Sequence, residues 1–114
     1  MKKITREAVL AFLNNYEYRN SNTEVTIGMD RELKLFGNTI ARYNRGDIEL
    51  TDAGWQSNTT KERLNGLLEL LNLSECKVYQ KNYTWYFDKN GERMLWDVAK
   101  QYNGFVSLDY MRGA

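Results

Sequence analysis

The sequence of 114 residues contains no histidine, no proline and a single cysteine, Cys76. The absence of histidine excludes a His-based catalytic triad, an imidazole general base and a His-ligated zinc site. One cysteine forms neither an intrachain disulfide nor a cysteine-rich metal site, which fits a reducing cytosol. No glycine-rich phosphate loop or other cofactor motif occurs, so we expect neither a metal nor a cofactor.

A large net charge and long apolar runs are also missing. Sixteen Lys and Arg residues are balanced by 15 Asp and Glu residues, so any nucleic-acid contact must depend on a local basic patch. No window approaches the roughly 20 apolar residues of a membrane span. The apolar stretch near the N-terminus is interrupted by Thr5, Arg6 and Glu7, so we expect no signal peptide. These features predict an intracellular protein that does not contact a membrane.

The chain has enough hydrophobic residues to form the core of one folded domain over residues 1–114. Hydrophobic residues make up 42% of the sequence and aromatic residues 13%. A first helix is predicted with Thr5 as its N-cap and an end near Asn15. Its apolar face has helical spacing and consists of Val9, Phe12, Leu13 and Tyr16.

Between residues 23 and 51 the apolar spacing changes to two, which is typical of strands. Val25 alternates with polar neighbours in this way, as does Leu33 and later Ile48. Turn residues separate the runs at 29–30, 37–38 and 44–46. The pattern predicts a four-stranded antiparallel meander with one buried face.

The second half of the chain predicts a helix and a hairpin. Thr59 and Glu62 have the spacing of a capping box, followed by leucines at helical spacing from residue 64 to 71. Residues 76–87 read as an aromatic hairpin that turns at 81–83. In a regular pleat Cys76 and Val78 share its inner face.

The last residues allow two interpretations. Residues 92–102 fit a helix or a strand almost equally, with the helix preferred, and residues 105–108 fit a short extended piece. The fold class is therefore α+β: an antiparallel sheet, made of the four-stranded meander plus the aromatic hairpin, packed with two or three helices.

One set of segments is distinctive in combination: KKITREAV (2–9), NTEV (22–25), LFGNTIA (35–41), AGW (53–55), TTKERLN (59–65), VYQK (78–81) and WY (85–86). Together these segments resemble a group of small uncharacterised proteins encoded in bacteriophage and prophage genomes. The resemblance covers about residues 2–87 and implies a phage accessory protein acting in the cytoplasm of a host bacterial cell. Residues 92–114 depart from the group and read as a C-terminal extension of a 1–91 core.

The first candidate binding site is the loop and helix start at residues 55–63. Backbone N–H groups at a helix N-terminus attract anions, and Lys61 and Arg63 add mobile positive charge. Thr59 and Thr60 offer hydroxyl groups, and Trp55 is able to stack on a nucleic-acid base. The structural alternative is that Thr59 only caps the helix and Trp55 plugs the edge of the core.

The second candidate is the outer face of the aromatic hairpin. Basic and aromatic residues alternate there as in proteins that bind single-stranded nucleic acid. The same residues would suit a protein partner, or a sheet face covered by a helix. Arg42 and Arg45 are secondary candidates for phosphate contact. The residues of this second candidate are Lys77, Tyr79, Lys81, Tyr83 and Tyr86.

Two other features are assigned structural roles. Asp47, Glu49 and Asp52 would bind Mg²⁺ only if their carboxylates converged, and alternating acids on an exposed strand are the ordinary explanation. Cys76 is expected to be a strand residue that packs inward. It is not expected to be a nucleophile, because no histidine is present to activate it and the adjoining charge is only Lys77.

These observations favour a binding protein over an enzyme, since no two Asp, Glu, Lys or Tyr residues have a recognisable catalytic spacing. The leading hypothesis is a non-enzymatic phage protein that binds a host protein or protein–nucleic-acid complex and inhibits a defence or nucleic-acid-processing complex. The alternative is a small protein that binds single-stranded DNA or RNA directly. The oligomeric state and the choice between the two candidate faces stay open.

Overall fold

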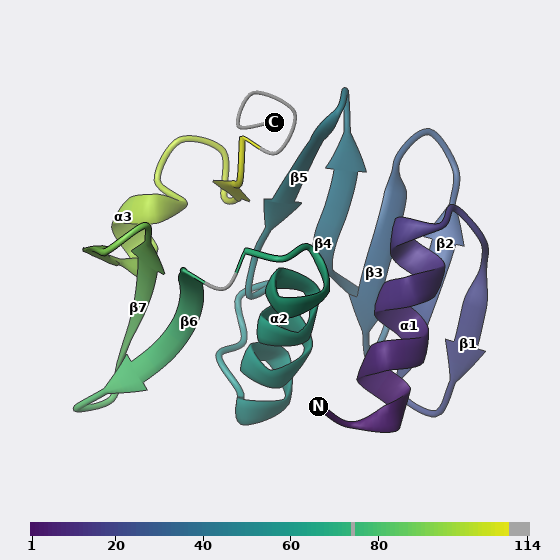
Figure 1. Ribbon diagram of the computed structural model, residues 1–114, viewed down its shortest axis with the longest axis horizontal. Helices are drawn as coiled ribbons and strands as arrows, with labels where there is room; N and C mark the ends of the chain where they lie inside the picture. The colour runs from purple at the N-terminus through teal and green to yellow at the C-terminus, as the bar shows by residue number, and fades with distance from the viewer. Residues whose placement is uncertain (74, 110–114) are drawn as a thin grey trace.

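The computed structural model describes residues 1–73 and 75–109, which form three helices and nine strands in two antiparallel sheets (Figure 1). None of the described helices has the length and apolar character needed to cross a membrane. In chain order the elements are α1 (Lys3–Leu13), β1 (Tyr18–Asn20), β2 (Thr23–Ile27), β3 (Arg31–Leu35), β4 (Asn38–Asn44), β5 (Asp47–Leu50), α2 (Asn58–Leu70), β6 (Cys76–Lys81), β7 (Thr84–Lys89), β8 (Glu92–Leu95), α3 (Trp96–Ala99) and β9 (Val106–Ser107).

The predicted meander is confirmed as β2, β3, β4 and β5, which pair in sequence order. The structure extends it to six strands, because β1 pairs with β2 and β9 pairs with β5. The alternating residues Val25, Leu33 and Ile48 are all buried, as the period of two requires. Helices α1 and α2 pack against each other and lie side by side over one face of this sheet (Figure 1).

The aromatic hairpin is also confirmed, as β6 and β7 of a second sheet that β8 completes. Both interpretations of the following residues were partly right, since residues 92–95 are a strand and residues 96–99 a short helix. Trp96 begins that helix and is fully buried, with its ring 5.6 Å from Trp85 and 6.4 Å from Phe87 between centroids. The last part of the described chain therefore belongs to the core.

The predicted start of the first helix is wrong. The helix begins at Lys3 with Lys2 as its N-cap residue, so Thr5 lies in the first turn and is fully buried. Its hydroxyl group donates a hydrogen bond to Glu62 of α2 and does not cap its own helix. A threonine suits both roles, and the contact between the two helices decides which one it takes.

The capping box at the second helix is wrong as well. The N-cap residue is Ser57, whose Oγ accepts a hydrogen bond of 3.1 Å from the backbone N–H of Thr60. Glu62 turns toward α1, where it accepts from the Thr5 hydroxyl and the Lys2 backbone N–H.

The guanidinium group of Arg63 in α2 contacts both α1 and β2. It is buried, and it donates hydrogen bonds of 2.8 Å to the Thr5 hydroxyl and 3.2 Å to the Thr23 hydroxyl. It also pairs with the Glu62 carboxylate beside it. Because a buried charge without partners is costly, this network fixes how the two helices sit on the sheet.

One edge of the second sheet is closed by a side chain. The Asn65 amide of α2 donates to the Val78 carbonyl at 2.8 Å and accepts from the Val78 N–H at 2.9 Å. These two bonds satisfy backbone groups of β6 that a further strand would otherwise pair.

A buried carboxylate connects the two sheets. Asp52, which follows β5, accepts a hydrogen bond of 3.0 Å from Trp96 Nε1 and one of 2.9 Å from Lys100 Nζ. Burial alone would raise the pKa of Asp52, but the hydrogen bonds from Lys100, the Gly54 amide and Gln56 outweigh it. The pKa of this carboxyl group therefore lies below its ordinary value.

The close approach of α1 and α2 at Gly66 generates a first prediction. A Cβ atom at this position would collide with Cγ2 of Thr5. Gly66→Ala should therefore lower the free energy of unfolding by about 1–3 kcal/mol, although alanine is the better helix former by about 1 kcal/mol. Adding Thr5→Ser removes the methyl group, keeps the hydroxyl and should restore stability. Urea unfolding of both variants measures this, and a stable single variant would contradict it.

The Asp52 carboxylate gives a prediction on pH. At pH 7, Asp52→Asn should lower the free energy of unfolding by about 2 kcal/mol, because Lys100 loses its charged partner. Since the folded-state pKa is depressed, this contribution is complete above the unfolded-state pKa and disappears as the pH falls through the folded-state value.

Denaturant unfolding of wild type and Asp52→Asn at several pH values from 7 to 3 measures this. The difference between the two proteins should be constant at neutral pH and shrink below about pH 4. A difference that persists unchanged at pH 3 would contradict the assigned role of the carboxylate.

Candidate functional site

Three exposed aromatic side chains lie at one end of the molecule. Phe36 lies in the β3–β4 turn and is 64% exposed, Trp55 follows β5 and is 68% exposed, and Tyr83 lies in the β6–β7 turn and is 94% exposed. The start of α2 and the β6–β7 turn mark this end on the lower side of Figure 1. We call Phe36, Trp55 and Tyr83 the aromatic end surface.

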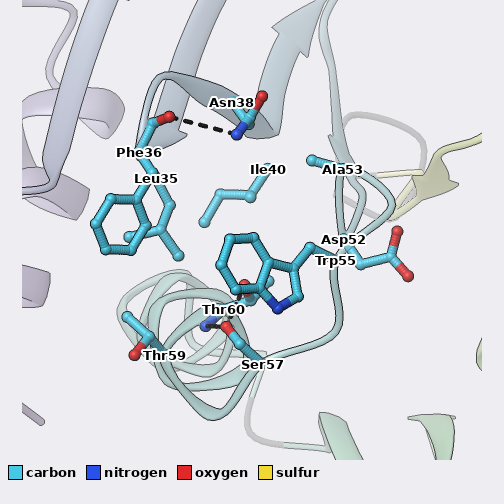
Figure 2. A pocket seen from close by; sticks show the side chains of 10 residues that line it. All are labelled: Leu35, Phe36, Asn38, Ile40, Asp52, Ala53, Trp55, Ser57, Thr59 and Thr60. Carbon is cyan, nitrogen blue, oxygen red and sulfur yellow. Dashed lines mark hydrogen bonds between the residues drawn. The ribbon is translucent and has the colours of Figure 1, made fainter.

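A pocket of about 270 Å³ lies between the β3–β4 turn and the start of α2. Figure 2 shows Phe36 and Trp55 on either side of the aliphatic side chains of Leu35 and Ile40, which are buried. Thr59 adds a hydroxyl group at the helix start. An apolar floor between two exposed aromatic rings suits an apolar side chain of a ligand.

A second hollow of about 230 Å³ continues this surface toward the hairpin. It is lined by Gln56, which follows Trp55 in the chain, and by Tyr83, Trp85 and Leu95 of the second sheet. The Gln56 amide donates to Asp52 at 3.2 Å, so the loop is held by the carboxylate that connects the two sheets. Trp55 and Ser57 line the first hollow and Gln56, between them in the chain, lines the second, so the two hollows lie next to the same loop.

The backbone conformation of two of these aromatic residues is unusual. Phe36 has a φ of 51° and Tyr83 a φ of 64°, both in the left-handed region. Two-residue hairpin turns require this region and favour Asn-Gly, because the left-handed conformation costs other residues roughly 1–2 kcal/mol. Since the two rings are mostly exposed, burial does not offset this cost.

The residues of the first predicted site fall in different places. Trp55, Thr59 and Thr60 all line the pocket, and Thr60 is the buried one of the three. Trp55 is mostly exposed, so it does not plug the core edge. Lys61 donates to Gln80 at 3.1 Å and lies 5.7 Å from the centre of the Trp85 ring. The expectation of mobile positive charge at Arg63 is wrong, because its guanidinium is buried in the helix network.

The second predicted site stays together on the outer face of the β6–β7 hairpin, apart from Tyr83 at its tip. Lys77 and Lys81 are exposed, and the rings of Tyr79 and Tyr86 stack with their centres 5.6 Å apart. The interpretation of a face covered by a helix is wrong for these described residues, since both lysines reach solvent.

The secondary candidates lie elsewhere. Arg42 donates to Glu49 at 2.7 Å, and its guanidinium lies 3.8 Å from the centre of the Phe105 ring. Arg45 is exposed in the β4–β5 turn, at the opposite end of the strands from the aromatic end surface.

The acidic residues are structural, but not in the expected way. Glu49 and Asp52 are buried and paired with Arg42 and Lys100, and so are not exposed acids on a strand. Within the described residues no group of three or more acidic or cysteine side chains is arranged to hold a metal ion. Cys76 packs inward as predicted, and burial raises the pKa of its thiol.

Sequence reasoning missed Phe36 as a functional candidate. It placed the turn at 37–38, whereas β4 starts at Asn38 and the turn is Phe36-Gly37. The available signal was the Phe-Gly pair between two alternating runs, where Asn-Gly is the usual choice.

Comparison with known proteins gives one match. The sequence model of the family described as Kyanoviridae Gp96 protein matches residues 1–111, which includes most of the C-terminal residues that departed from the sequence resemblance. No curated protein and no solved structure matches the chain. The match confirms the resemblance to phage proteins, and the chain belongs to the Kyanoviridae Gp96 family of bacteriophage proteins.

Proposed function

We propose that this phage protein is a non-enzymatic binding protein that occupies a surface of a host protein through its aromatic end surface. The observation that carries the proposal is Phe36, a bulky side chain held in a left-handed turn and exposed beside an apolar pocket. The turn itself favours asparagine or glycine there, so an exposed phenylalanine at this position points to a role of the ring in contact with a partner.

The surface has the composition of a protein-binding site. Tryptophan and tyrosine are enriched among the interface residues that contribute most to affinity. The pocket between Phe36 and Trp55 accepts one apolar side chain of the partner, and Thr59 and Asn38 offer polar groups near it. An apolar centre with a polar rim is the usual anatomy of such interfaces.

Charge favours a protein partner over a nucleic acid at this surface. Lys and Arg are absent from the residues that line the two hollows, while Asp52 and Asp97 are present. A phosphate backbone is bound chiefly by Lys and Arg side chains, which neutralise the phosphates and release the counterions condensed on the nucleic acid. A partner that inserts an apolar side chain needs none.

The proposed biological role follows from the phage family. A small protein without a catalytic set acts by occupying a surface, and in the cytoplasm of an infected cell that surface belongs to a host defence or nucleic-acid-processing complex. Blocking such a surface requires affinity alone, which is what the aromatic end surface supplies.

The proposal is tested by capture from nuclease-treated lysate of a host bacterium. Immobilised wild-type protein should retain one host protein reproducibly, and Trp55→Ala and Phe36→Asn should each weaken its affinity at least tenfold, the effect of losing about 1.4 kcal/mol. The matched control is Tyr16→Ala, which should bind like wild type. Tyr16 is an exposed tyrosine that follows the C-terminal end of α1, away from the aromatic end surface.

Phe36→Asn also separates binding from folding. Because asparagine suits the left-handed turn better, this variant should unfold at the same or a higher denaturant concentration than wild type. Retention of no host protein, or equal retention by wild type and both pocket variants, would contradict the proposed function. A Phe36→Asn variant that loses stability would contradict the argument from the turn.

A further inference from the structure

The second sheet has an outer face that the aromatic end surface does not use. Cys76, Val78, Trp85 and Phe87 point inward to the core, so their neighbours along the strands point outward. Five outward residues define what we call the basic tyrosine face: Lys77, Tyr79 and Lys81 of β6, Tyr86 of β7 and Arg93 of β8.

The tyrosines and the arginine form one continuous cluster on this face. Tyr79 and Tyr86 are paired across the two strands and stack with 22° between their planes. The guanidinium carbon of Arg93 lies 5.6 Å from the Tyr79 ring centre and 5.2 Å from that of Tyr86. Arg93 is exposed and both tyrosines are half-buried, so part of the aromatic and guanidinium surface is open to solvent on the outer face of the sheet.

Positive charge is concentrated around this cluster. Lys77, Lys81 and Arg93 are all exposed and frame the two rings. The one carboxylate among them, Asp88, accepts a hydrogen bond of 3.0 Å from the Tyr79 hydroxyl. The net charge of the whole chain is only +1, so three cations beside two tyrosines are a local concentration of positive charge. The two hollows of the aromatic end surface, by contrast, have no Lys or Arg in their lining.

We propose that the basic tyrosine face binds single-stranded nucleic acid. An open sheet face with aromatic residues at its centre is a surface on which unpaired bases stack, and a guanidinium plane serves in the same way. Lys77 and Lys81 lie at the two ends of β6 and pair with successive phosphates as the strand crosses the sheet. Duplex DNA hides the flat surfaces of its bases, so it binds this face more weakly.

The test is fluorescence anisotropy of the purified full chain with labelled single-stranded DNA and RNA at 50 mM NaCl. Both oligonucleotides should bind, and a duplex of the same length should bind at least tenfold more weakly. Tyr86→Ala should weaken binding at least fivefold through lost stacking. Tyr16→Ala, which changes an exposed tyrosine elsewhere, is the control and should leave affinity unchanged.

Salt dependence tests the cations separately with a variant that keeps the sheet intact. Contact of Lys77 and Lys81 with phosphates predicts a slope of about −1.4 for log affinity against log salt concentration, falling to about zero in Lys77→Ala/Lys81→Ala. Lys3→Ala/Arg6→Ala, which removes two exposed charges from α1, should keep the wild-type slope.

Three results would overturn the proposal: no binding to either oligonucleotide at 50 mM NaCl, equal binding of duplex and single strand, or unchanged affinity and slope in the face variants. The first result would rule out nucleic acid as the ligand of this face. Since the lysate capture uses nuclease-treated material and variants of the aromatic end surface, failure of one proposal leaves the other intact.

Discussion

The buried carboxylate of Asp52 is the interaction on which the arrangement of the molecule depends. It accepts from the Trp96 indole and from Lys100, so it joins the end of the six-stranded sheet to the second sheet. Trp96 in turn packs on Trp85 and Phe87. The loop that carries Trp55 is bound to the same carboxylate through Gln56, so Asp52 also helps to position the aromatic end surface.

The two proposed surfaces differ in chemistry and come from different sheets. The aromatic end surface combines apolar hollows with no lysine or arginine in their lining, whereas the basic tyrosine face combines stacked rings with three exposed cations. They meet near the β6–β7 turn, where Tyr83 follows closely after Lys81. If both proposals hold, a partner that contains protein and nucleic acid would contact both surfaces at once.

Local patterns in the sequence predicted the strands but not the networks between elements. Alternation around Leu33 and Ile48 sufficed for the meander, because one buried face requires it. The roles predicted for Thr5, Glu62 and Arg63 were wrong. The sequence alone does not show whether a polar side chain caps its own helix, faces solvent or bonds to a neighbouring helix. Phe36 was missed because its meaning depends on a backbone angle that only the structure shows.

The central claim is that Phe36, Trp55 and Tyr83 contact one partner together. Site-specific photocrosslinking tests it most directly, with a photoreactive phenylalanine placed at each of the three positions and at Tyr16 as a control, in host cells that express the protein. The account predicts the same crosslinked host protein from all three positions and none from the control. Different proteins from the three positions, or equal crosslinking from Tyr16, would contradict it.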